Sequence, residues 1–303
     1  MNKTDEELLN KVIDNSIQEV DSYNIRKNGK RIDYKNNPYI EIISKEDGKG
    51  IDIYVKENTL FGIIDIPVII TKGGFKDVVY NDFHIGKNSN IIIVAGCGIH
   101  NNDNHDSIHD GIHRFYLEEN SKVKYIEKHY GEGKGKKILN PVTEIEMKKG
   151  SNMTIDSTQI EGVDKTIRTT KASLEKDATL IINEKIKTYK KQFAKTDFIV
   201  NLNGENASCH VTSRSVAIDN SYQEFTSFVT GNAKSFAHIE CDAIIQNNAS
   251  VKAKPEIFAN HVDANLIHEA AIGKIAGEQL IKLMSLGLTE KEAEKTIIDG
   301  FLK

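Results

Sequence analysis

The chain has 303 residues, and its 40 Lys and Arg against 44 Asp and Glu give a formal net charge of −4. This near balance argues against a dedicated nucleic-acid-binding protein, and a hydrophobic content of 39% argues against global disorder. No apolar run approaches the roughly 18 residues that a membrane helix needs, and the N-terminus lacks the apolar stretch of a secretory signal. We therefore expect a soluble, cytoplasmic protein that binds neither a membrane nor nucleic acid.

Residues 1–20 have the pattern of an amphipathic helix, because their apolar side chains recur every three or four positions. Thr4 and Glu7 have the spacing of a capping box. The segment 24–36 that follows is polar and basic, and we interpret it as a surface loop.

Between residues 38 and 267 the pattern changes to short apolar runs that alternate with turn residues. The runs are rich in β-branched residues and are three to five residues long, which fits strands better than helices. The strand candidates are 40–43, 51–55, 60–64, 91–94, 123–126, 180–182 and 198–202.

An imperfect repeat precedes many of these strands: a turn residue, a small residue, a variable residue and an apolar residue, as in 88–91 and 177–180. The units begin at Asn88, Asn120, Gly150, Asp177, Asn206, Asn232, Asn248 and Asp263, at intervals of 32, 30, 27, 29, 26, 16 and 15 residues. A unit of about 15 residues, often seen doubled, cannot bury its own apolar face, so such units stack. The sequence therefore predicts a β-solenoid, with a β-sandwich as the alternative.

The C-terminal residues return to helical spacing. One amphipathic helix is expected over 275–286, ending at Gly287. A second is expected over 289–302, where Thr289 and Glu292 have the spacing of a capping box. A helical hairpin of this kind can present apolar side chains to a partner.

The chain has three cysteines, Cys97, Cys209 and Cys241, and their odd number and wide separation argue against a disulfide framework. Cys97 lies in a segment rich in histidine. Because thiolate and imidazole are ligands of zinc and iron, we treat Cys97, His100, His105, His109 and His113 as secondary metal-site candidates, with His129 further along the chain. Their spacing matches no fixed zinc-finger pattern, so histidines of surface loops and sheets are the alternative.

A second group of metal-ligating residues lies near the end of the predicted solenoid. His268 and Glu269 follow Cys241 by 27 and 28 residues, which places them about two repeat units away. From the residues alone, a cysteine buried in a strand is the alternative.

The sequence around these residues resembles the C-terminal signature of the SufB/SufD family, the scaffold proteins of the SUF iron–sulfur cluster assembly system. The resemblance rests on HEAAIGKI at 268–275, EQL at 278–280, LMSLGL at 283–288, ECDAII at 240–245 and EKEAEKTIIDGFL at 290–302. It is strongest over residues 170–303 and weaker before them. It implies a mainly β protein, with a right-handed parallel β-helix as its core and helical N- and C-terminal segments.

The resemblance also implies a site. Cys241 matches the SufB cysteine implicated in nascent cluster assembly, and His268 and Glu269 match the His-Glu pair of SufB. His268 also falls at the position of a SufD histidine that faces this cysteine across the heterodimer. Because this chain carries both residues, we expect a homodimer that holds a transient iron–sulfur cluster, expected to be [4Fe-4S]. Cys97 and its histidines lie outside the aligned motifs, and the chain has no tryptophan where SufB often has one.

The expected function is therefore a non-catalytic scaffold for assembly and transfer of iron–sulfur clusters. Its expected partners are a SufC-like ABC-type ATPase, a sulfur donor and recipient apoproteins. The chain lacks a G-x-x-x-x-G-K-[ST] motif, so we assign ATP hydrolysis to the ATPase. The expected domains are an N-terminal helix and loop (1–37), the β-helix core (38–267) and a helical segment that docks the ATPase (268–303). The alternative is a carbohydrate-active β-helix enzyme or binding module, although the chain shows no evident paired-carboxylate motif.

Overall fold

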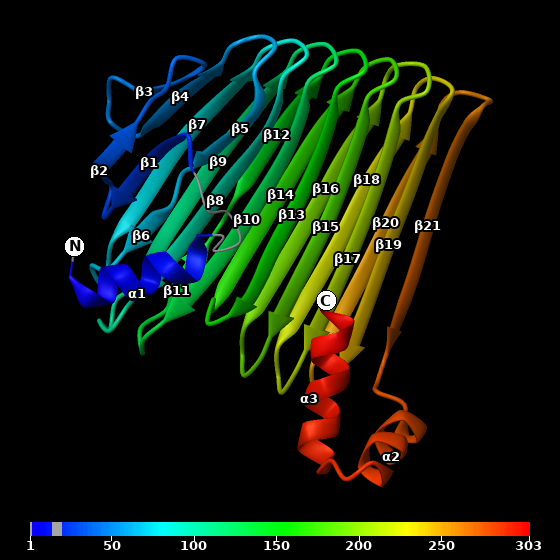
Figure 1. The fold of residues 1–303 in the computed structure, drawn as a ribbon. Helices are drawn as coiled ribbons and strands as arrows, with labels where there is room; N and C mark the ends of the chain where they lie inside the picture. The colour runs from blue at the N-terminus through cyan, green and yellow to red at the C-terminus, as the bar shows by residue number, and fades with distance from the viewer. Residues whose placement is uncertain (1, 14–19) are drawn as a thin grey trace.

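Two large sheets face each other as the walls of a parallel β-solenoid (Figure 1). The computed structural model describes residues 2–13 and 20–303. From residue 76 to residue 132 and again from residue 152 onward, successive long strands alternate between the two sheets, and each pairs in parallel with the strand one full turn later. This arrangement confirms the predicted solenoid and excludes the β-sandwich.

The first sheet, which we call sheet A, contains in spatial order β2 (Lys30–Lys35), β1 (Ser22–Lys27), β5 (Leu60–Asp65), β8 (Asn90–His100), β10 (Lys122–Glu132), β13 (Asn152–Glu161), β15 (Thr179–Thr188), β17 (Ser208–Ala217), β19 (Ser235–Ile245) and β21 (Ala264–Gly273), with β6 (Val68–Ile70) beside β1 and β8. Sheet B contains β20 (Ser250–Ala259), β18 (Tyr222–Gly231), β16 (Phe193–Leu202), β14 (Lys165–Leu174), β11 (Lys137–Leu139), β9 (Ser107–Leu117), β7 (Lys76–Ile85), β4 (Gly50–Val55) and β3 (Ile40–Ser44), with β12 (Val142–Met147) beside β14 and β9.

The strands form because every second side chain is buried between the sheets. In β16, for example, Phe198, Val200 and Leu202 are buried, and the residues between them are partly exposed. One continuous apolar core runs along the solenoid. All seven strand candidates lie within observed strands, although the strands extend further because polar residues also occupy inward positions.

The repeat corresponds to the turns between the sheets. Asn88, Asn120, Asp177 and Asn206 have φ values of 55°, 56°, 58° and 60°, the left-handed region that Asn and Asp tolerate better than most residues. The small residue that follows is buried; the Ser121 hydroxyl, for example, donates a hydrogen bond to the carbonyl of Glu118. A unit of about 15 residues is thus one strand with its turn. Two units make one full turn of the solenoid, because strands of the same sheet pair at separations of 27–32 residues between residues 90 and 208.

The N-terminal segment differs from the prediction. Helix α1 (Lys3–Val12) begins after Asn2, which forms the capping box with Asp5 in place of Thr4 with Glu7. The rest of the predicted helix falls partly on residues 14–19, outside the described residues.

The prediction of a loop at 24–36 is wrong, because β1 and β2 form an antiparallel hairpin there. Polar Asn24 and Arg26 occupy buried inward positions of β1, which strands commonly fill with apolar residues. The Arg26 guanidinium donates to the carbonyls of Gly29 and Gly48, at 2.9 and 3.0 Å, and lies 3.8 Å from the Asp77 carboxylate. Strand β1 therefore has the composition of a loop and the alternating burial of a strand, whereas β2 is mostly exposed.

Two helices follow the last strand, α2 (Gly277–Ser285) and α3 (Glu290–Phe301). The predicted capping box of Thr289 and Glu292 is confirmed, and α3 packs through Ile298 and Leu302 against Val216 of β17. The expected boundary between residues 267 and 268 falls inside β21. Of the helices in the described residues, none is long and apolar enough to cross a membrane.

Candidate functional site

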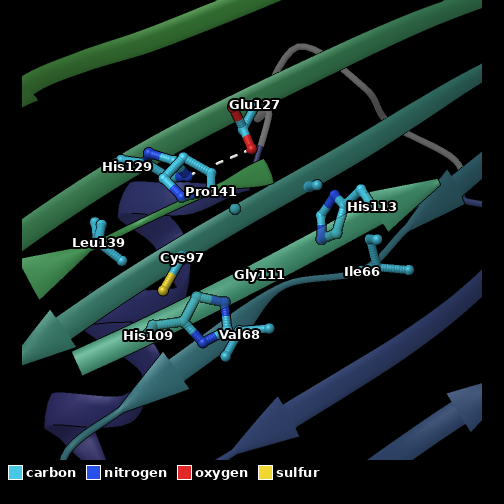
Figure 2. A pocket seen from close by; sticks show the side chains of 12 residues that line it. Ile66, Val68, Cys97, His109, Gly111, His113, Glu127, His129, Leu139 and Pro141 are labelled. Atoms are coloured by element: carbon cyan, nitrogen blue, oxygen red, sulfur yellow. Dashed lines mark ion pairs between the residues drawn. The ribbon is translucent and has the colours of Figure 1, made fainter. Parts of the chain in front are cut away.

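A series of buried polar side chains lies beside the apolar core, between Cys97 and Cys241. At its N-terminal end, Cys97 of β8 lines a cavity of about 20 Å³ together with His109 and His113 of β9 and Glu127 and His129 of β10 (Figure 2). All five come from strands whose inward faces meet at this level of the solenoid. Three candidates from the histidine-rich segment are therefore neighbours in space.

His109 links Cys97 to a carboxylate. Its Nδ1 lies 3.2 Å from Asp77 Oδ2, and all three side chains are buried. Burial alone would lower the pKa of His109, but interactions with the Cys97 thiol and the Asp77 carboxylate raise this pKa to about 10. These neighbours favour the imidazolium form of His109, which lies between a carboxylate and a sulfur atom.

His113 is held in the opposite charge state. Its Nε2 lies 3.2 Å from the amide nitrogen of Asn81, which can only donate, so Nδ1 carries the proton and donates to the Tyr125 hydroxyl at 2.7 Å. Burial lowers the pKa of His113 to about 4. A neutral imidazole with both nitrogens engaged is held in a fixed orientation.

The remaining candidates lie elsewhere. His100 pairs with Glu132 at 2.6 Å, and exposed His105 pairs with Asp103 at 2.9 Å, both away from the cavity. Within residues 2–13 and 20–303, no group of three His, Cys, Asp or Glu side chains is arranged to hold a metal ion. A metal ion at the histidine-rich segment stays a prediction for Cys97, His109 and His113, and its binding would require the imidazoles to give up their present hydrogen-bond partners.

Two glycines on either side of Cys97 allow α1 to lie directly on the outer face of β8. A Cβ atom at Gly96 would lie 2.4 Å from the carbonyl oxygen of Val12, and one at Gly98 would lie 2.8 Å from the Leu8 side chain. Any larger residue would push the helix away. The strand that carries Cys97 is thus covered by α1 on one side and faces the cavity on the other.

A buried ion-pair network continues the polar series toward the C-terminal end. The Arg168 guanidinium binds Glu127, its second terminal nitrogen lies 3.1 Å from His129 Nδ1, and its Nε lies 3.5 Å from Glu184 Oε1. Burial would raise the pKa of Glu127, but Arg168 holds it well below the usual range. Burial raises the pKa of Glu184 despite Arg168, and Glu184 also accepts hydrogen bonds from Thr196 and Ser213.

Cys241 lies at the C-terminal end of this series. Its side chain is buried on β19 and lines a cavity of about 10 Å³ together with Glu184, Ser213 and Phe225. Burial, with a smaller contribution from Glu184, raises the pKa of the Cys241 thiol to about 12. The thiol is therefore protonated at neutral pH and must lose its proton before it can bind iron.

His268 and Glu269 lie on β21, the strand that pairs with β19. His268 is opposite Ile239, Glu269 is opposite Glu240, and Cys241 is opposite Ala270, so His268 lies diagonally across from Cys241, two positions along the neighbouring strand. The His268 ring lies 6.4 Å from the Phe225 ring, inside the solenoid. Its Nε2 is buried and has no hydrogen-bond partner within the described residues.

Glu269 points to the other side of the sheet. Its exposed carboxylate lies 3.5 Å from His238 Nε2 on the outer face. The structure therefore places Cys241 and His268 on the inward faces of neighbouring strands, one full turn apart, and places Glu269 on the opposite face of the sheet.

Glu127, Arg168 and Glu184 belong to none of the sequence motifs. A signal for them was present in the alternation: Glu127 shares the inward face of β10 with Val123 and Tyr125, and Glu184 shares the inward face of β15 with Ile182. A charged residue at an inward position of a strand indicates a buried ion pair.

Comparison with known proteins identifies the family of the chain. Residues 99–235 and 188–301 match the family model of the SufBD core domain, SUF system FeS cluster assembly. An iron–sulfur cluster assembly SufBD family protein of Methanocaldococcus jannaschii is 31% identical over 265 residues, which cover 85% of this chain and 82% of that protein. A SufBD family protein of Pyrococcus horikoshii is 29% identical over 268 residues, with coverages of 85% and 78%. One of Archaeoglobus fulgidus is 28% identical over 244 residues, with coverages of 79% and 65%.

Proposed function

Because the chain belongs to the SufBD family of iron–sulfur cluster assembly proteins, we propose that it is a scaffold on which a transient cluster is assembled and from which it is transferred. The observation that carries this proposal is the placement of Cys241 and His268 on adjacent strands at the open end of the solenoid, both facing its interior. The scaffold has no catalytic activity of its own in this proposal.

The ligand set suits a cluster that must leave again. Iron–sulfur clusters are held most firmly by thiolates, and histidine replaces thiolate at some irons. Cys241 supplies one thiolate, and the unpartnered Nε2 of His268 supplies a second donor. A cluster with so few thiolates, expected to be [4Fe-4S], is held loosely enough for a recipient apoprotein to take it.

A homodimer would double this ligand set. Strands β20 and β21 end the two sheets, so each has one edge without a partner strand among the described residues. Apolar residues near this end are exposed, among them Phe258 and Ile272. An open, partly apolar sheet edge favours association, and a two-fold axis here would bring two copies of Cys241 and His268 close together and place Glu269 at the interface.

The ATPase partner is proposed to bind the α2–α3 hairpin. Ile281 and Leu286 of this hairpin are 68% and 77% exposed, whereas Ile298 and Leu302 anchor α3 on the solenoid. Exposed apolar side chains on an anchored helical hairpin suit the apolar groove of a partner.

Anaerobic reconstitution tests the proposal. The purified chain is incubated with ferrous iron and sulfide, and bound iron, acid-labile sulfide and the visible absorption are measured, followed by transfer to an apo-ferredoxin. We expect a brown chromophore with iron and sulfide in equal amounts, and its loss to the acceptor. A chain that binds neither iron nor sulfide, alone or with its ATPase, contradicts the proposal.

A further inference from the structure

A groove of about 650 Å³ lies at the edge of the solenoid where the chain passes from sheet A to sheet B. Its lining residues fall between 106 and 193, so they do not include Cys241. Its walls include Lys136, Lys165, Lys190 and Lys191, all of them exposed. Ile138 and Phe193 also line it, and the Phe193 ring stacks on Tyr222 of the next turn at 5.6 Å. The groove thus combines four ammonium groups with an apolar floor.

These four lysines are set apart by being gathered around one groove. Some lysines elsewhere on the solenoid pair with a carboxylate on the neighbouring turn: Lys148 with Glu175, Lys176 with Glu205, Lys171 with Glu144 and Lys254 with Glu224. Others, such as exposed Lys149 and Lys234, have no carboxylate partner within the described residues. Within the described part of the chain, none of the four groove lysines has a carboxylate partner.

The carboxylates of the groove do not neutralise this charge. Asp164 is already bound by Lys137, whose ammonium nitrogen lies 2.8 Å away and whose backbone N–H also donates to it. Asp106 is the other acidic side chain that lines the groove. A chain with a net charge of −4 therefore carries a local excess of positive charge here.

We propose that this groove binds an acidic, extended segment of a partner protein, with an aromatic or aliphatic side chain placed on Phe193 and Ile138 between flanking carboxylates. The lysines span β11, β14 and the turn before β16, about 10 Å at the usual spacing of strands in a sheet. That distance matches three or four residues of extended chain. A compact anion would reach fewer of the lysines and would leave the apolar floor uncovered. The negative net charge of the chain disfavours nucleic acid as the ligand. This inference does not depend on the cluster, so its failure leaves iron and sulfide binding unaffected.

The test uses the full chain and a fluorescein-labelled peptide of sequence Asp-Glu-Phe-Glu-Asp, with fluorescence anisotropy as the readout. We expect saturable binding that weakens with added salt. The double variant Lys165→Glu/Lys190→Glu should weaken the Kd at least tenfold, and Phe193→Ala should weaken it several-fold. The matched control is Lys148→Glu/Lys176→Glu, which changes the same charge at the opposite edge of the solenoid and should leave peptide binding within twofold. Melting temperatures establish that each variant is folded; if Phe193→Ala unfolds, a peptide with Ser in place of Phe replaces it.

Two results would overturn the inference. One is equal peptide affinity for the wild type and the groove variant. The other is that inorganic tripolyphosphate displaces the peptide while neither Phe193→Ala nor the Ser-containing peptide changes affinity, because the groove would then be an anion site that makes no use of its apolar floor.

Discussion

Cys241 and His268 occupy adjacent strands of sheet A and both face the interior, although they are 27 residues apart in the sequence. Glu269, the next residue, faces outward and pairs with His238. Neighbours in the sequence therefore have different positions relative to the cysteine. In the proposed dimer, His268 binds the cluster together with Cys241 of its own chain, whereas Glu269 contributes from the dimer interface.

This difference gives the first prediction. His268→Ala should reduce cluster retention about 10-fold, the order of effect seen when a residue that supports a metal site is removed, at any protein concentration. Glu269→Gln should reduce retention only at concentrations at which the chain is dimeric. Iron release to a chelator, measured beside light scattering over a dilution series, checks both. If Glu269→Gln reduced cluster retention as much in the monomer as in the dimer, the position of Glu269 at the dimer interface would be contradicted.

The buried network makes a second prediction. Arg168→Met leaves the buried carboxylates of Glu127 and Glu184 without their cation, which should cost about 3–5 kcal/mol of the free energy of unfolding at pH 7. The double variant Arg168→Met/Glu127→Gln should recover part of this loss. Denaturant unfolding measures both.

The same variants should also differ in their pH dependence. In the wild type the pKa of Glu127 is held well below 4.5, so its contribution to stability is present above that pH and is lost as the pH falls through the folded-state value. In Arg168→Met, burial should raise this pKa, so stability should fall as the pH rises from about 4 to 7. If the free energy of unfolding changed with pH in the same way in the wild type and in Arg168→Met, the Arg168–Glu127 ion pair would be contradicted.

Asp65 gives a third prediction. Burial raises the pKa of its carboxyl to about 7, and its Oδ1 has no hydrogen-bond partner within the described residues. The unfolded chain loses this proton near pH 4 and the folded chain near pH 7, so stability should fall across this range, by roughly 4 kcal/mol at most. Asp65→Asn should remove this slope and raise the melting temperature at pH 8. Asp299→Asn, at an exposed position of α3, is the control and should change neither.

The fourth prediction concerns the ATPase. Ile281→Glu should abolish co-purification with the ATPase, because it places a charge on the most exposed part of α2 without touching the residues that anchor α3. Lys295→Glu on α3 is a charge-changing control and should leave the complex intact. Unchanged co-purification after Ile281→Glu, or after deletion of residues 275–303, would exclude the hairpin as the docking site.

The sequence predicts the β-solenoid well because two strong local signals agree: the left-handed turn residues, such as Asn120 and Asn206, and the short apolar strands. It fails at 24–36, where Asn24 and Arg26 replace apolar residues at inward positions. Tertiary hydrogen bonds compensate for that burial, and no local pattern reveals them.

The candidate site was predictable only in part. The resemblance pointed to Cys241, His268 and Glu269, but the spacing did not show that two repeat units make one turn, which places Cys241 and His268 on adjacent strands. Similarly, the histidine-rich segment looked like one group, but the strand alternation sends His109 and His113 inward while His100 pairs with Glu132 away from the cavity. Which side chains meet depends on the register between turns, which a single sequence does not specify.

The most direct test compares two buried cysteines. Cys209 on β17 resembles Cys241 in burial, and burial raises the pKa of each thiol to about 12, but Cys209 is not adjacent to His268 in the sheet. Cys241→Ala and Cys209→Ala should each cost about 1 kcal/mol of stability. After anaerobic reconstitution, iron and sulfide per chain should be lost in Cys241→Ala and retained in Cys209→Ala. Full iron and sulfide in Cys241→Ala, with only a lowered melting temperature, would show that Cys241 is a core residue and not a cluster ligand.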